Sequence, residues 1–226
     1  MKTIIICGMQ RSGTTALFNI IRLLSQLHGY SLNAAFVDDY DPSIAADIHL
    51  IKTHVVPEPL LQKMIAIGRP APELGVTFIS SHRDVRDVVA SAMRMGWIED
   101  ERVMGHLADV FDRYTKSETF ADYNMRYENF KADPIATMLS LAAAIDMPIT
   151  QEQAQELDQE LRALNDLKVP QGHYDPITLL HNNHVGTGDS GDHKQRLTPA
   201  RIAEIETLYG DWLKDKGYDV PASSSP

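Results

Sequence analysis

The feature that most constrains this chain is a short segment with two glycines near its N-terminus. Residues 8–15 read Gly-Met-Gln-Arg-Ser-Gly-Thr-Thr, directly after the apolar run Ile4–Cys7 and before a stretch with apolar residues at helical spacing. A buried strand, a tight turn and the N-terminus of a helix, in this order, direct backbone N–H groups at an anion. The segment therefore predicts a phosphate-binding loop, with Ser12, Gly13, Thr14 and Thr15 among its candidate binding residues.

The loop differs from that of a nucleoside triphosphatase at one position. Gly8 lies five positions before Gly13, as in a Walker loop, but Thr14 follows Gly13 where a triphosphatase has lysine. The cation of the segment is Arg11, which precedes the second glycine. The loop is therefore predicted to bind a phosphate but to lack the lysine that contacts the β- and γ-phosphates of a nucleoside triphosphate. A glycine-bearing turn kept only for packing is the alternative.

Strand and helix patterns alternate through the N-terminal half. The pattern predicts strands at 3–7, 48–51 and 76–80, and helices at 14–28, from Pro57, at 84–95 and at 101–115. A polar loop with Asp38, Asp39 and Asp41 is expected after the first helix. This order favours an α/β fold of the P-loop nucleotide-binding type, with a central parallel β-sheet flanked by helices.

The C-terminal half is predicted to be mostly helical. A short strand is expected near 122–127, followed by helices at 134–145, after the capping-box pattern at Thr150, and from Pro199 to Gly217. Residues 166–197 are polar and irregular. No clear linker interrupts the chain, so we expect one α/β domain over residues 1–220 and a frayed tail over 221–226.

Composition excludes some classes of function. The chain has 226 residues and a net charge of −10, which disfavours nonspecific binding to nucleic acid or to an anionic membrane. Its one cysteine, Cys7, cannot form an intrachain disulfide. The apolar run after Lys2 is too short for a signal peptide, and no stretch approaches a membrane span. These observations favour the cytoplasm.

Two further groups of polar residues follow predicted strands, where ligands bind in open parallel sheets. Lys52 and His54 come after the strand at 48–51. His54 has the residue type of a general base and Lys52 that of a cation for a transferring anion, although both also occur as ordinary loop residues. Arg83 leaves the strand at 76–80 and Ser91 lies eight residues later, a pair suited to a second phosphate. Pairing of Arg83 and Arg86 with nearby aspartates is the alternative.

The segment 181–196 gathers histidines, acids and bases, among them Lys194 and Arg196. A metal site can be drawn from these residues, but no ligand spacing is specific, so we expect no metal and prefer a mobile segment that faces an anion. Trp97 and Tyr127 are aromatic residues suited to stacking on a base, with core packing as the simpler interpretation.

Taken together, these segments resemble the PAPS-dependent sulfotransferases, where PAPS is 3′-phosphoadenosine 5′-phosphosulfate. That family has a Gly-x-x-[Lys/Arg]-Ser-Gly-Thr-Thr loop, a Lys-Thr-His tripeptide, an arginine with serine eight residues on, and a Tyr-Glu-x-x-Lys-x-Asp-Pro segment. Residues 8–15, 52–54, 83–91 and 127–134 match these motifs in order. The resemblance spans about 3–217.

The resemblance implies roles for single residues. Arg11, Ser12, Gly13, Thr14 and Thr15 would bind the 5′ side of PAPS; Arg11 and Lys52 would also offset charge during transfer, and His54 would act as base. Arg83 and Ser91 would bind the 3′-phosphate. The remaining donor-binding residues implied are Tyr127, Gly188, Lys194 and Arg196.

One part of the family pattern is altered. The family's C-terminal loop often reads Arg-Lys-Gly-x-x-Gly-Asp-Trp-Lys, whereas Gly186 and Thr187 replace its two cations here and His193 replaces its tryptophan. Lys194 or Arg196 would then have to supply the missing charge.

The resulting hypothesis is sulfuryl transfer from PAPS to a hydroxyl acceptor, less favourably an amine, on a small molecule or a glycan. Two alternatives stay open. One is a P-loop small-molecule kinase or nucleotidase, which would need Mg²⁺ and a carboxylate such as Asp84 or Asp87. The other is a non-catalytic nucleotide-binding protein of the same fold.

Overall fold

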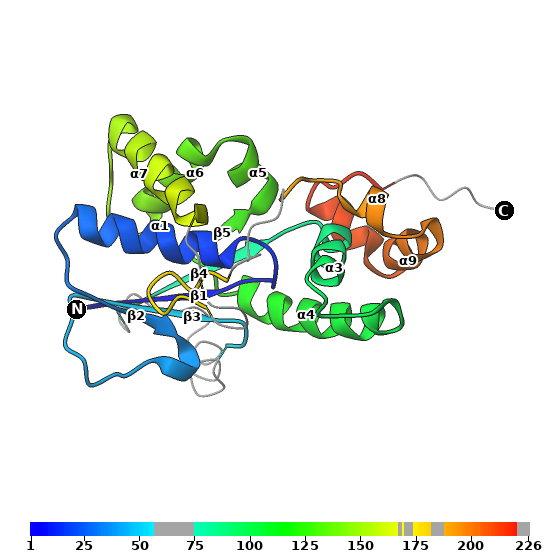
Figure 1. The fold of residues 1–226 in the computed structure, drawn as a ribbon, viewed down its shortest axis with the longest axis horizontal. Helices are drawn as coiled ribbons and strands as arrows, with labels where there is room; N and C mark the ends of the chain where they lie inside the picture. The colour runs from blue at the N-terminus through cyan, green and yellow to red at the C-terminus, as the bar shows by residue number, and fades with distance from the viewer. Residues whose placement is uncertain (57–74, 167–168, 170–173, 182–187, 221–226) are drawn as a thin grey trace.

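A five-stranded parallel sheet forms the centre of the molecule (Figure 1). The computed structural model describes residues 1–56, 75–166, 169, 174–181 and 188–220. The strands are β1 (Lys2–Cys7), β2 (Leu32–Phe36), β3 (Ile48–Thr53), β4 (Val76–His82) and β5 (Tyr123–Arg126). They lie in the order β2-β3-β1-β4-β5, and every neighbouring pair is parallel. The predicted parallel sheet and α/β fold class are confirmed.

Helices cover this sheet and make up most of the C-terminal half. The α-helices of the described residues are α1 (Thr14–Leu27), α3 (Val85–Arg94), α4 (Val103–Glu118), α5 (Tyr127–Ala132), α6 (Pro134–Ala144), α7 (Gln151–Ala163), α8 (His193–Arg196) and α9 (Pro199–Asp215). Short 3-10 turns occupy Val37–Asp39, Asp100–Arg102 and Leu164–Asp166. Among these described helices, none is long and apolar enough to cross a membrane.

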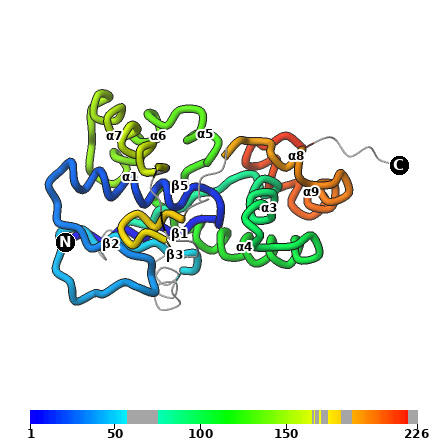
Figure 2. The backbone as a smooth tube through the Cα atoms, in the orientation of Figure 1, coloured from blue at the N-terminus to red at the C-terminus, as the bar shows by residue number. Residues whose placement is uncertain are grey.

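The central strand β1 is buried on both faces. Ile4 and Ile6 belong to one apolar cluster, which also contains residues of α1, α6 and α7, whereas Ile5 and Cys7 belong to another with Phe78 of β4. Adjacent residues of a strand point to opposite faces, so the run Ile4–Cys7 serves both clusters. Burying each isoleucine contributes about 1.5–3 kcal/mol. The backbone tube shows α6 and α7 on the same side of the sheet as α1 (Figure 2).

A further cluster joins α3, α4 and α9 beyond the end of the sheet. Val85 and Val88 of α3 pack with Leu107 of α4 and with Ile205 and Leu213 of α9. These helices lie together at one end of the molecule in Figure 1, with α8 beside them. The cluster holds α3, which carries Ser91, against the C-terminal helix.

Side-chain caps set the starts of several helices. The carboxylate of Asp84 accepts a hydrogen bond from Arg86 N at 2.9 Å, and that of Asp133 accepts one from Ala136 N at 2.9 Å. Thr150 and Gln153 form both halves of a capping box. Each cap satisfies an N–H group that has no partner inside its helix. The capping box predicted at Thr150 is therefore confirmed.

Three local predictions need correction. The predicted loop after α1 contains strand β2, whose short sequence Leu-Asn-Ala-Ala-Phe lacks a strong strand pattern. Strand β3 continues through Lys52 and Thr53, and β4 continues through His82, because polar residues extend both strands at their carboxyl ends. The short strand expected near 122–127 is confirmed as β5, and helix α5 begins directly after it at Tyr127. The helix predicted from Pro57 and the tail 221–226 lie outside the described residues.

The strand order creates a switch point at β1. After β1 and α1 the chain passes to β2 and β3 on one side, whereas β4 and β5 lie on the other side. Cys7 pairs with Thr53 in register, and Ile6 pairs with Ile79. Ligands of such sheets bind in the crevice that opens at this point, beyond the carboxyl ends of the strands.

Candidate active site

The phosphate loop fits tightly between β1 and β4. A Cβ on Gly8 would lie 2.4 Å from Ser81 Oγ and 2.7 Å from Ser81 N, so the first position of the loop needs glycine. Gly13 has a φ of 88° and lies against Tyr127, which makes glycine the suitable residue there as well. Arg11 also has a positive φ, 64°, a conformation that is uncommon outside glycine. The loop is therefore held by close packing on both sides.

The hydroxyl of Ser12 holds the loop from inside. It donates to Met9 O at 2.5 Å and lies 2.6 Å from Ser81 Oγ, and the residue is fully buried. Thr14 and Thr15 instead begin α1 on the wall of a cavity, where N–H groups of the first turn lack helical partners. Ser12 therefore stabilises the loop itself, whereas Thr14 and Thr15 lie on the cavity wall and can bind an anion.

Lys52 and His54 stand at the end of β3, beside the first turn of α1. Lys52 Nζ donates to Thr15 Oγ1 at 2.8 Å and lies 5.9 Å from the centre of the Phe36 ring. Burial and the nearby Arg11 lower the pKa of Lys52 to about 8. His54 Nδ1 lies 3.3 Å from Gly8 O, and because a carbonyl only accepts, Nδ1 is the protonated nitrogen. Nε2 is then the basic atom of the ring.

The environment of His54 keeps its ring neutral. Burial and the charge of Lys52 lower the pKa of His54 to about 4. The ring of Phe36 lies 6.1 Å from the His54 ring, centre to centre. A neutral imidazole at pH 7 has the protonation state that a general base requires.

Arg11 connects the loop to α3. Its Nε donates to Ser91 Oγ at 3.0 Å, and its guanidinium lies 5.0 Å from the centre of the Trp97 ring. Burial, then the charges of Arg94 and Arg83, lower the pKa of Arg11 to about 10. Three guanidinium groups therefore gather near Ser91. Trp97, half exposed, is paired with a cation here and not packed in the core.

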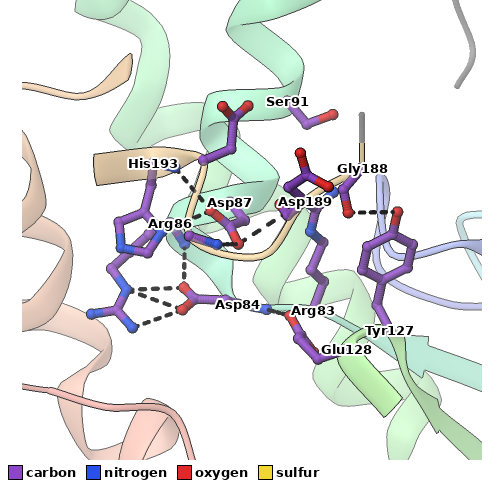
Figure 3. Close-up of polar contacts among 12 residues, drawn as sticks. Arg83, Asp84, Arg86, Asp87, Ser91, Tyr127, Glu128, Gly188, Asp189 and His193 are labelled. Carbon is purple, nitrogen blue, oxygen red and sulfur yellow. Dashed lines mark hydrogen bonds and ion pairs between the residues drawn. The ribbon is translucent and has the colours of Figure 1, made fainter. Parts of the chain in front are cut away.

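Arg83 lies in a second group of charged residues, which includes Asp84, Arg86 and Asp87 (Figure 3). Its guanidinium stacks on Tyr127 at 4.4 Å and donates to Asp189 O at 2.9 Å. The nearest carboxylate oxygen, on Asp87, is 3.9 Å away. The Tyr127 hydroxyl donates to Gly188 O at 3.2 Å. Arg83 and Tyr127 thus share one wall with the backbone of residues 188–189.

One cavity of about 500 Å³ brings most of the predicted residues together. The predicted residues on its wall are Arg11, Gly13, Thr14, Thr15, Lys52, His54, Arg83, Ser91, Tyr127 and Gly188. Lys194 and Arg196 are exposed on α8 and do not line it, and Arg196 pairs with Asp192 at 2.6 Å. Gly186 and Thr187 lie outside the described residues.

The motifs and the cavity agree with the comparison against protein-family models. The sulfotransferase domain model matches residues 1–217 of this chain. The chain belongs to the sulfotransferase family. The family predicted from the four motifs is therefore confirmed. No curated protein matches the sequence significantly.

Solved structures share the fold of this sulfotransferase at low sequence identity. Mouse sulfotransferase SULT7A1, solved as a complex with PAP, is 14% identical, with a TM-score of 0.68 over 94% of this chain and 85% of that one. Retinol dehydratase, solved with androsterone and the inactive cofactor PAP, is 16% identical, with a TM-score of 0.65 over 98% and 84%. A second retinol dehydratase structure, with retinol and PAP, is 15% identical, with a TM-score of 0.64 over the same shares.

Sequence reasoning missed several residues on the cavity wall of this sulfotransferase. Among them are Phe36, Arg94 and Tyr174. Arg94 had a usable signal, because it follows Ser91 by three residues and therefore shares its face of α3. Phe36 had no such signal, because strand β2, which ends at Phe36, was not predicted from the sequence.

The carboxylates near Arg83 are engaged within the protein. Asp84 pairs with Arg86 at 2.7 Å, which is the aspartate pairing expected as the alternative for Arg86. Asp87 accepts from Gly191 N, His193 N and His193 Nδ1 at 2.8, 2.9 and 2.7 Å. Within the part of the chain that the structure describes, these two acids and His193 are the one group close enough to share a metal ion, within 4.8 Å. Their existing partners favour a structural network over the Mg²⁺ site that a kinase would need.

Proposed function

We propose that this sulfotransferase moves the sulfuryl group of PAPS to the hydroxyl of a small molecule. The observation that carries the proposal is the meeting of three sequence motifs on one cavity. The phosphate loop follows β1, Lys52 lies near the end of β3 with His54 directly after that strand, and Arg83 follows β4. Two separate anion sites, with a neutral histidine beside the phosphate loop, suit a donor with phosphates on both sides of its ribose.

The loop and the first turn of α1 would bind the 5′-phosphate of the donor. The N–H groups there, with Thr14 and Thr15, offer donors that are directed at an anion. Thr14 in place of the Walker lysine suits a phosphosulfate better than a triphosphate. Arg83 and Ser91 would bind the 3′-phosphate, supported by their place in the lining of one cavity and by the contact of each with Arg11.

His54 would remove the acceptor's proton during transfer. As the acceptor oxygen bonds to sulfur, the bond from sulfur to the bridging oxygen breaks, and that oxygen leaves with the electron pair on adenosine 3′,5′-bisphosphate. His54 Nε2 would take up the released proton, since Nδ1 is held by Gly8 O. A positioned base of this kind contributes about 100- to 10,000-fold in rate.

Lys52 and Arg11 would stabilise the charge that develops on the leaving oxygen. Lys52 Nζ already donates to Thr15, so it lies beside the first turn of α1, where the 5′-phosphate would bind. Negative charge on a bound donor raises the pKa of nearby cations and of His54, which would strengthen the base in the complex. The free site therefore holds a weak base that the donor itself improves.

The acceptor proposed here is small and partly apolar. Phe36 lies beside both Lys52 and His54, so an acceptor hydroxyl at His54 would meet an aromatic ring. Tyr174 and His181, whose rings are 5.6 Å apart, line the same cavity. These walls support a small alcohol or phenol more than a glycan. The reaction is proposed to take place in the cytoplasm, supported by the single, buried Cys7.

Calorimetry with EDTA present tests the donor. We expect adenosine 3′,5′-bisphosphate to bind much more tightly than ATP, without added metal. A panel of small alcohols, phenols and amines with labelled PAPS then tests transfer. Tight Mg²⁺–ATP binding with no affinity for the bisphosphate would contradict the proposal, and bisphosphate binding with no transfer to any acceptor would favour a non-catalytic protein.

A further inference from the structure

The altered C-terminal loop leaves a deficit of positive charge near Arg83. The two positions where the family has cations hold Gly186 and Thr187. Lys194 and Arg196, the nearest basic residues in sequence, are exposed on α8 and do not line the cavity. Arg83 is itself partly offset by Asp87, 3.9 Å away. Lys131 lines the cavity next to Gly188, so it is on the side of Ser91 that a 3′-phosphate would draw on another cation.

Arg94 lies where such a cation is needed. It is the last residue of α3, three positions after Ser91, so both side chains lie on one face of the helix. It lines the cavity together with Arg11, Arg83 and Ser91. Its charge acts on Arg11, whose pKa falls through burial and through the charges of Arg94 and Arg83.

The surroundings of Arg94 suit an anion better than a structural ion pair. Arg83 has Asp87 nearby and Arg86 binds both Asp84 and Glu206, but Arg94 has no carboxylate within 4.0 Å among the described residues. Grouping like charges at a half-buried site costs free energy unless an anion joins them. Arg94 is only half-buried, so it also has room to move toward a ligand.

We propose that Arg94 is a donor-specificity residue that binds the 3′-phosphate of PAPS together with Arg83 and Ser91, in place of the cations missing from the C-terminal loop. This inference rests on the proposed function and refines its donor site. A guanidinium in the last turn of a helix also stabilises that helix through its dipole, which is the structural alternative.

The test compares Arg94→Met with Lys194→Met and Arg196→Met. Calorimetry measures the binding of adenosine 3′,5′-bisphosphate and of adenosine 5′-monophosphate, which lacks the 3′-phosphate. Arg94→Met is expected to weaken bisphosphate binding at least about tenfold and monophosphate binding less than about twofold. The two α8 variants should stay within about twofold of the parent for both nucleotides.

Further variants separate binding from folding. Arg94→Lys keeps a cation at the helix end and should recover most of the bisphosphate affinity, whereas Arg94→Gln should not. Thermal melting of the free proteins measures the structural alternative. A lower melting temperature with unchanged preference for the bisphosphate would overturn the inference.

Other outcomes are equally clear. Equal losses for both nucleotides in Arg94→Met would show that Arg94 does not read the 3′ group. If Lys194→Met or Arg196→Met weakens bisphosphate binding and Arg94→Met does not, the 3′-phosphate is bound from the C-terminal loop segment and not by Arg94. If the parent itself does not prefer the bisphosphate over the monophosphate, the proposed donor fails as well. If the parent prefers the bisphosphate and Arg94→Met shows the same preference, only the role of Arg94 is overturned.

Discussion

The two ends of the cavity hold their charged groups in different ways. At the transfer end, Lys52 donates to a hydroxyl and His54 to a backbone carbonyl, and burial lowers the pKa of Lys52 to about 8 and of His54 to about 4. At the other end, Arg83 stacks on Tyr127 and donates to Asp189 O, with Asp87 nearby.

This difference separates chemistry from binding. Groups whose pKa lies near or below neutrality exchange protons easily, as a base and its neighbours must. Guanidinium groups stay charged and suit a phosphate that does not react. Substitutions at the transfer end should therefore change rates, and those at the Arg83 end should change affinities.

The largest effect is expected for His54→Ala. The variant should lower kcat and kcat/KM together by about 100- to 10,000-fold, because a base acts only as the acceptor proton leaves. Affinity for adenosine 3′,5′-bisphosphate should stay within about twofold, as measured by calorimetry. His28→Ala removes an exposed histidine outside the cavity and serves as the control. A folded His54→Ala protein that turns over within about threefold of the parent would place the base elsewhere.

Arg83→Ala should show the opposite behaviour. Hydrogen bonds to charged groups contribute about 1.5–3 kcal/mol, so bisphosphate affinity should fall by about 10- to 150-fold. Binding of adenosine 5′-phosphosulfate, which lacks the 3′-phosphate, should change little, and kcat at saturating PAPS should fall much less than affinity. Arg102→Ala, at an exposed arginine, is the matched control. Equal losses for both nucleotides would remove the distinction between the two ends.

The sequence predicted the residues of the transfer end better than those of the binding end. Arg11, Lys52 and His54 lie within motifs on neighbouring strands, so local sequence and the parallel sheet were enough to bring them together. The binding end depends on where a distant loop meets α3. Lys194 and Arg196 were expected there from the resemblance of the C-terminal loop to the family pattern, but they are exposed on α8 and do not line the cavity, while Gly191 and His193 are bonded to Asp87. Such a tertiary contact has no local signal.

Lys52 gives the transfer end a specific pH dependence. Because the pKa of Lys52 is lowered to about 8, its ammonium is present below that pH and is lost as the pH rises through it. With an aliphatic alcohol as acceptor, kcat/KM for the donor should be level near pH 7 and fall up to about tenfold per unit above pH 8. Lys52→Arg keeps its charge throughout this range, so the decline should move to higher pH. An unchanged decline in a folded Lys52→Arg protein would assign it to another group.

The smallest effect is expected at His193, which acts on the binding end through another residue. Burial alone would raise the pKa of Asp87, but hydrogen bonds from His193 and Gly191, with the charge of Arg83, hold it below its usual value. The His193 ring supplies one of three bonds that fix residues 188–193 against α3, while Asp189 O in turn accepts from Arg83.

His193→Phe keeps the buried ring and both backbone bonds to Asp87 but removes the Nδ1–H donor. Loss of one hydrogen bond to a carboxylate that keeps two others should loosen the loop and weaken bisphosphate binding by about three- to tenfold, with kcat nearly unchanged. His193→Asn, whose amide can replace Nδ1–H, should recover part of the affinity. Calorimetry and steady-state kinetics measure both quantities. If His193→Phe lowers kcat but leaves bisphosphate affinity intact, the loop serves the transfer end, and the division between chemistry and binding does not follow the two ends of the cavity.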